Sequence, residues 1–199
     1  MPQPTETSGQ LFVIVIDETY GGDEATYEED SEQYRQNLIH EFGKDFEEVN
    51  VGPGADIPAF LTDLANTSIP LWSAVLGAFF LGKPIKDNLD AWLQMRDALR
   101  RFFSRPVVLA RHGAAVLAIN AIVDEIGDMP RLVRLLSYRV GHISEGDGWK
   151  QIDAEKVIQE NPPTLNLGYL IHVFEIEADD SLFRIAVDGK KAEVVRIDF

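Results

Sequence analysis

The spacing of hydrophobic residues changes along this chain, and the changes predict where strands and helices lie. Residues 11–16 are continuously apolar and largely β-branched, which is typical of a strand buried on both faces. Between residues 27 and 42 the apolar side chains recur at helical spacing, and Gly43 follows as a natural end. Residues 46–51 alternate weakly and predict a second strand. The chain is therefore expected to begin as a strand–helix–strand unit.

The middle of the chain is predicted to be helical. Asp56 is expected to begin a short helix that carries Phe60. The most apolar stretch, 69–81, predicts a buried helix of roughly 20 Å, which is shorter than the ~30 Å core of a membrane. Two further helices are expected, one over 84–103 starting at a proline and one over 114–126 that is apolar on almost every face.

The last third of the chain has the pattern of antiparallel strands. Residues 131–143 predict a strand, and three further runs of strand type follow at 170–177, 182–187 and 192–197. The dipeptide Asp188-Gly189 lies between two of these runs and is a strong hairpin signal, because both residues tolerate a positive φ.

These elements predict an α+β fold. A mixed sheet is expected from the N-terminal strand–helix–strand unit and the C-terminal antiparallel meander, packed against the helical middle segment. Residues 1–10 are polar and are expected to form a flexible tail. Residues 11–199 are expected to form a single α+β domain, a usual size for one hydrophobic core.

Charge is the unusual feature of the composition. The 199 residues carry a net charge of −15, but residues 1–60 contain 14 acidic and 2 basic residues, whereas residues 61–140 contain 7 and 10. Such an acidic chain repels phosphates, so free nucleic acid is not expected as a partner. The chain has no cysteine, which excludes disulfides and thiolate metal sites. Since residues 1–10 also lack the pattern of a secretory signal, the expected location is the cytoplasm, with no membrane partner.

Two groups of polar residues are candidates for chemistry. Asp17 and Glu18 end the first strand, where paired carboxylates can hold a magnesium ion. His142, Glu145 and Asp147 lie in a glycine-rich segment that combines an acid/base candidate with two carboxylates. Both groups also fit a polar turn without catalytic activity. Because the chain has no complete nucleotide-binding, phosphate-loop or nucleophile motif, no cofactor is expected.

Two groups of charged residues are candidates for binding a partner. The acidic group comprises Glu28, Glu29, Asp30 and Glu32, and the basic group comprises Arg96, Arg100, Arg101 and Arg105. The two groups are expected either to pair within the fold or to meet other molecules.

We therefore expect an acidic interaction protein without catalytic activity that binds a basic protein, as immunity, antitoxin or bacterial accessory proteins do. A small metal-assisted hydrolase and a homo-oligomeric structural protein are the alternatives. The hydrolase would use Asp17 and Glu18, or His142, Glu145 and Asp147. In the homo-oligomer, the acidic third would dock on the arginine group of another copy.

Overall fold

The computed structural model describes residues 11–49, 57–64, 70–86, 88–142 and 170–197. They form four helices and two four-stranded antiparallel sheets, which confirms the predicted α+β class. The elements, in chain order, are β1 (Phe12–Ile16), α1 (Tyr27–Phe42), β2 (Glu47–Glu48), β3 (Ala59–Asp63), α2 (Pro70–Phe80), α3 (Leu89–Arg100), β4 (Val107–Leu109), α4 (Arg111–Ile126), β5 (Val133–His142), β6 (Leu170–Ala178), β7 (Ser181–Asp188) and β8 (Lys191–Ile197).

The first sheet has the strand order β2-β3-β1-β4, with β1 in its interior. Strand β1 pairs antiparallel with β3 on one side and with β4 on the other, so that Val15 lies opposite both Phe60 and Val107. Helix α1 packs on this sheet through residues that include Leu38, which is buried, and Tyr34, which is half-buried. The Tyr34 ring lies 5.5 Å from that of Phe60. As predicted, α1 is followed by Gly43, which has a φ of 62° and ends the helix.

The second sheet is the predicted C-terminal meander, with the order β5-β6-β7-β8. Both of its described hairpins are closed by two-residue turns, Asp179-Asp180 and Gly189-Lys190. Gly189 has a φ of 53° and Lys190 does not lie in the left-handed region, which is the pattern of a type II′ turn. The strands are thus divided between two antiparallel sheets, rather than joined in the single mixed sheet that the sequence suggested.

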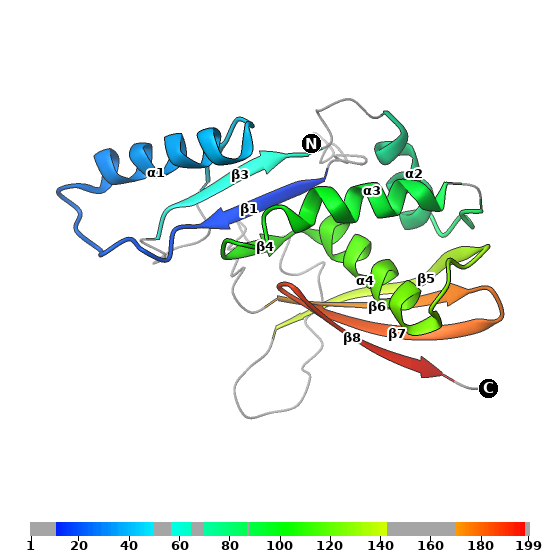
Figure 1. Cartoon of the computed structure of the whole chain (residues 1–199). Helices are drawn as coiled ribbons and strands as arrows, with labels where there is room; N and C mark the ends of the chain where they lie inside the picture. Colours follow the sequence, from blue (N-terminus) through cyan, green and yellow to red (C-terminus); the bar gives the residue numbers. More distant parts are fainter. Residues whose placement is uncertain (1–10, 50–56, 65–69, 87, 143–169, 198–199) are drawn as a thin grey trace, which may run out of the picture.

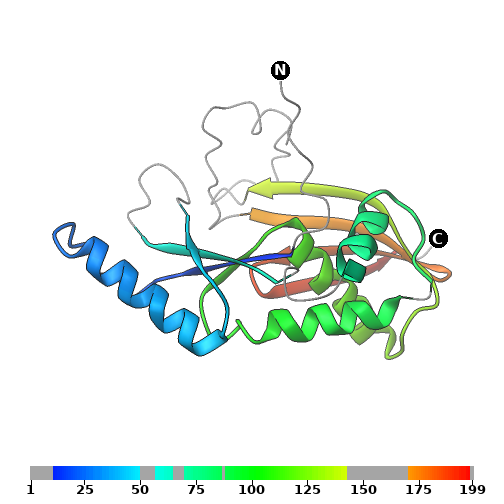
Figure 2. The same cartoon turned by 90° about the horizontal axis from the view of Figure 1, so that it is seen from above.

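Helix α4 connects the two sheets. It packs against β6, β7 and β8, against α3, and also against β1 and β4 of the first sheet (Figure 1). Nine of its sixteen residues are buried, which agrees with its predicted central position. Both views place α1 at one end of the molecule and the β5–β8 sheet toward the other (Figures 1 and 2).

One hydrophobic cluster includes residues of both sheets and of all four helices, counting the partly buried residues packed against it. This is the core that a single domain requires, although the domain assignment itself stays a prediction. No helix among the described residues combines the length and the hydrophobicity needed to cross a membrane. Residues 1–10, the predicted tail, lie outside the described part of the chain.

Three predictions for the middle of the chain need correction. Residues 59–63 form strand β3 and not a helix, because their backbone pairs with β1 on one side and β2 on the other. Helix α3 begins at Leu89 and not at Pro84, since Ile85 forms an isolated bridge with Val133. Strand β4 was not predicted, although Val107-Val108-Leu109 is a short run of strand formers after a proline.

Candidate functional site

A cavity of about 610 Å³ lies where the two sheets meet. Its lining comes from the carboxyl end of β1, from β4 with the segment before it, and from the hairpin turn between β7 and β8. The polar side chains among its lining residues are Glu18, Ser104, Arg105, His172, Asp188 and Lys190. The sequence singled out only Glu18 and Arg105 of these, because the other four come close to them only through the packing of the second sheet.

Strand β4 gives this cavity a backbone edge. It is the last strand of its sheet among the described residues. The N–H of Ile16 donates to the carbonyl of Pro106 at 3.0 Å, which makes this pair a hydrogen-bonded one. Hydrogen-bonded and non-hydrogen-bonded pairs alternate along an antiparallel ladder, so Val107 occupies a non-hydrogen-bonded position opposite Val15. Its N–H and C=O therefore point away from β1, toward the free edge.

The two cations at the cavity are already engaged within the fold. The guanidinium of Arg105 forms an ion pair of 2.5 Å with Glu41 and lies 5.8 Å from the centre of the Tyr34 ring. The ammonium of Lys190 donates to the carbonyl of Phe103 at 2.6 Å. The hydrogen bond with Glu41 is the main reason that the pKa of Arg105 is raised. Both cations thus hold neighbouring segments in place.

The two carboxylates at the cavity are not engaged in this way. Glu18 and Asp188 are exposed, and no described residue pairs with either of them. They lie on different elements, Glu18 after β1 and Asp188 at the end of β7. Because Arg105 is ion-paired with Glu41, the remaining charges of the lining are the two carboxylates and the ammonium of Lys190, so that negative charge is in excess.

His172 closes the cavity from the side of β6 and is buried. Its Nδ1 lies 2.8 Å from the Tyr138 hydroxyl. Its ring also hydrogen-bonds to the backbone of Leu109, and because that bond raises the pKa, the ring is the donor and the Leu109 carbonyl the acceptor. A neutral imidazole has one donor and one acceptor, so the Tyr138 hydroxyl donates a hydrogen bond to Nδ1. This network joins β4, β5 and β6.

Burial lowers the pKa of His172 and outweighs the opposing effect of the Leu109 bond. Its contribution to stability is therefore complete above the unfolded value of about 6.5 and is lost as the pH falls below it. We expect the free energy of unfolding to decrease from pH 7 to pH 5, with a slope from this residue of up to about 1.4 kcal/mol per pH unit. In His172→Gln, chemical denaturation across this range should show a shallower slope.

The exposed His40 on α1 provides the control for this experiment. His40→Gln is the matched comparison, because it removes an imidazole from the surface and leaves the buried contacts of His172 intact. An equal slope in His172→Gln and the parent chain would contradict the assignment of His172 as a buried neutral residue.

The expected magnesium site at Asp17 and Glu18 gains no support from the side chains around it. Asp17 is 4% exposed, and its carboxylate accepts hydrogen bonds from the backbone N–H (2.9 Å) and the hydroxyl (2.5 Å) of Thr19. Asp17 therefore stabilises the turn after β1. Among the described residues, no group of three or more histidine, aspartate or glutamate side chains is placed to hold a metal ion.

The second predicted group is not described by the structure as a site. Glu145 and Asp147 lie outside the described residues, and for His142 only the backbone is described. The backbone of His142 pairs with that of Leu170 at the same end of the second sheet as Asp188. Whether these three residues form a site therefore stays a prediction.

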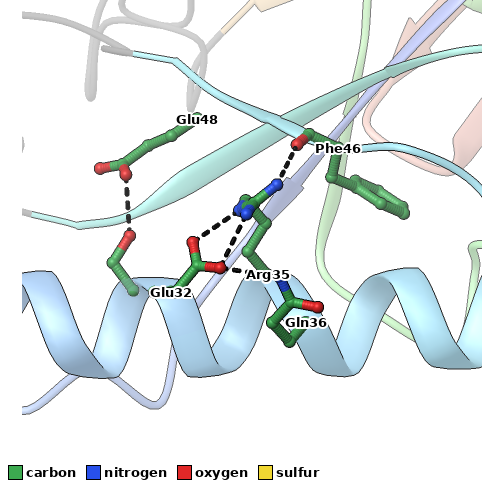
Figure 3. Close-up of polar contacts among 6 residues, drawn as sticks. Glu32, Arg35, Gln36, Phe46 and Glu48 are labelled. Carbon is green, nitrogen blue, oxygen red and sulfur yellow. Dashed lines mark hydrogen bonds and ion pairs between the residues drawn. The ribbon is translucent and has the colours of Figure 1, made fainter.

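The acidic group on α1 divides into engaged and free carboxylates. Glu32 accepts hydrogen bonds from Arg35 and Gln36, and these two bonds, the first being the larger effect, lower its pKa to about 2 (Figure 3). Asp30 accepts a hydrogen bond of 2.7 Å from Thr26. Glu28 and Glu29 are exposed, and no described residue pairs with them.

The same helix is held on its sheet by polar contacts that the sequence did not reveal. Arg35 also reaches the carbonyl of Phe46, and the buried Ser31 donates to Glu48 of β2 at 2.9 Å (Figure 3). Tyr27 donates to the other oxygen of Glu48 at 2.5 Å. These contacts fix the first turns of α1, so that Glu28 and Glu29 are presented from an anchored helix.

The arginine group divides in the same way. Arg105 pairs with Glu41 of α1, which is one direct contact between the acidic and basic segments of the chain. Arg96 pairs with its neighbour Asp97 and donates to Asn120 of α4 at 3.2 Å. Arg100 and Arg101 are exposed, and no described residue pairs with their side chains. The fold thus satisfies part of both groups and leaves part of both in solvent.

No family model, curated protein or solved structure matches this chain.

Proposed function

We propose that this chain is a cytosolic protein-binding module without catalytic activity, which docks on a basic surface of another protein in the manner of an immunity, antitoxin or accessory component. The observation that carries the proposal is the pair of exposed carboxylates of Glu28 and Glu29, which no described residue pairs with, on an anchored helix at one end of the molecule. Charges held in this way steer a basic partner and add to its affinity.

The distribution of charge supports binding of a basic partner over the alternative that the acidic residues only keep the protein soluble. The carboxylates of Glu32 and Asp30 are engaged with their own helix, and Glu41 is engaged with Arg105. On α1, the carboxylates that no described residue pairs with are therefore those of Glu28 and Glu29, in the first turn. The hydrolase alternative gains no comparable support from the described residues, which hold no group of three or more side chains placed to bind a metal ion, and two of its candidates, Glu145 and Asp147, lie outside them.

A salt titration with a neutralised variant tests the proposal. Partners captured on the immobilised chain are identified and purified, and their affinities are measured at about 50 mM and about 300 mM NaCl. We expect the affinity to fall at least about tenfold at the higher salt concentration. The double variant Glu28→Gln/Glu29→Gln should bind several-fold more weakly at low salt, because each change removes an attractive charge.

Glu125→Gln/Glu193→Gln is the matched control, because it removes the same number of exposed carboxylates from α4 and β8. It should bind like the parent chain. Equal losses in both double variants, or an affinity that does not change with salt, would refute the proposal. Circular dichroism must show an intact α1, since Glu28 and Glu29 also stabilise the helix N-terminus by about 0.3–1 kcal/mol each.

Light scattering at the same two salt concentrations separates this proposal from self-association. The homo-oligomer would pair Glu28 and Glu29 of one copy with the free Arg100 and Arg101 of another. A mass that falls with salt would favour the homo-oligomer, whereas a constant monomer mass leaves the charged residues available for a different protein.

A further inference from the structure

We propose that the cavity at the edge of β4 that no described strand covers binds an extended segment of the basic partner, which adds to β4 as a short strand. The inference rests on the proposed function for the basic character of the partner, and it specifies where and how a part of that partner is bound. Three observations carry it: the backbone edge, the uncompensated carboxylates and the open hairpin turn.

The backbone edge supplies the directional hydrogen bonds. Val107 turns both its N–H and its C=O toward the cavity, as the alternation of pairs along β1 and β4 requires. Leu109, two residues further, has the same orientation, and its carbonyl is already taken by the ring of His172. The contact with His172 confirms the direction of these groups and also closes the edge at that end. Pairing is therefore centred on Val107, where one residue of the segment would exchange two backbone hydrogen bonds.

The charges at the cavity favour a basic segment. Arg105 is neutralised by its ion pair with Glu41, whereas Lys190 donates one hydrogen bond to the Phe103 carbonyl and keeps its positive charge. Glu18 and Asp188 have no such partner among the described residues. Their carboxylates come from the two different sheets that border the cavity. A lysine or arginine next to the partner residue that pairs with Val107 could thus form an ion pair with Glu18 or Asp188.

The hairpin turn leaves room beside this edge. Gly189 lines the cavity, and a Cβ atom added there would meet no other atom within 4 Å. The volume of about 610 Å³ lies within the range of pockets that bind small ligands or short peptide segments, about 300–1,000 Å³. Strand addition at such an edge obtains affinity from backbone bonds and specificity from the flanking side chains.

Defined peptides test this inference without knowledge of the natural partner. The probe is an acetylated and amidated peptide of about seven residues that alternates valine or threonine with lysine. A second peptide carries an N-methyl group on the central amide, and a third has glutamate in place of lysine. Affinities are measured at low salt, and the hydrogen exchange of the Val107 amide is followed by NMR.

We expect the basic peptide to bind and to slow exchange of the Val107 amide by at least about tenfold at saturation. The N-methylated peptide should bind at least about tenfold more weakly, because it loses a backbone hydrogen bond while the protein is unchanged. The glutamate peptide should not bind measurably. Failure of the basic peptide to bind at about 1 mM, unchanged exchange at Val107, or equal affinity of the N-methylated peptide would each overturn the proposal.

Charge variants of the protein complete the experiment. Glu18→Gln/Asp188→Asn should weaken the basic peptide at least about fivefold. Glu125→Gln/Asp180→Asn, which removes the same charges from exposed positions away from the cavity, should not. Equal effects of the two variants would overturn the site. Because Glu28→Gln/Glu29→Gln tests the acidic helix separately, failure at Val107 and failure of the proposed acidic docking can be told apart.

Discussion

Replacement of Phe60 by alanine is expected to lower the free energy of unfolding by about 3–5 kcal/mol. The Phe60 side chain is 0% exposed and lies on β3, between β1 and β2. Its ring contacts that of Tyr34 on α1, so it joins the helix to the sheet. Alanine would remove this aromatic contact and leave a cavity that the surrounding strands cannot fully close.

Urea denaturation measures this effect, and two variants control it. Phe60→Leu should cost much less than alanine, because it retains most of the apolar volume. Leu81→Ala should change stability by no more than about 0.5 kcal/mol, since Leu81 is 72% exposed. A loss below about 1 kcal/mol in Phe60→Ala would contradict the position of Phe60 in the core.

The second large effect is expected at Phe174 in the other sheet. Its side chain is also 0% exposed, and its ring lies 5.0 Å from that of Tyr138. Phe174→Ala should therefore lower the free energy of unfolding by about 3–5 kcal/mol as well. Val195→Ala on β8, where the side chain is 60% exposed, should be close to neutral.

The two alanine variants together test the single-domain prediction. Because one hydrophobic cluster contains both Phe60 and Phe174, each substitution should shift the same cooperative transition by fluorescence and by circular dichroism. Two separate transitions, with only one moved by each variant, would show that the sheets fold as independent units. Sheet-specific shifts would then also weaken any site built between the sheets.

The segment around Phe60 shows why sequence patterns predicted some elements and not others. Phe60, Leu61 and Leu64 have a spacing that fits a helix, but a short apolar run fits a buried strand equally well. Residues 59–63 form a strand because β1 and β2 supply backbone hydrogen-bond partners on both sides. Helix α1 was predicted from its periodicity, and α2 and α4 from long apolar runs. Residues 131–143, by contrast, fitted a helix after Pro130 as well as the strand that was predicted, and strand β5 forms there.

The candidate site shows the same division. Glu18 and Arg105 stood out because of their position after a strand and in a basic group. Asp188 stood out only as part of a predicted hairpin turn and Lys190 was not singled out, and only the packing of the two sheets places them at the same cavity. For Glu32, the i, i+3 spacing to Arg35 was visible in the sequence, yet its engagement with Gln36 and the anchoring of α1 required the folded structure.

By itself, the sequence determined the α+β class, the periodic elements, the absence of cysteine chemistry and the uneven distribution of charge. These properties follow from local spacing and composition, which the chain carries in any conformation. The tertiary structure decided that β3 is a strand, and that Glu32 and Glu41 are paired while Glu28 and Glu29 have no partner among the described residues. It also decided that the edge of β4 that no described strand covers lies beside Glu18 and Asp188. These properties depend on which distant segments pack together, because hydrogen bonds and ion pairs form only between groups that the fold brings within reach.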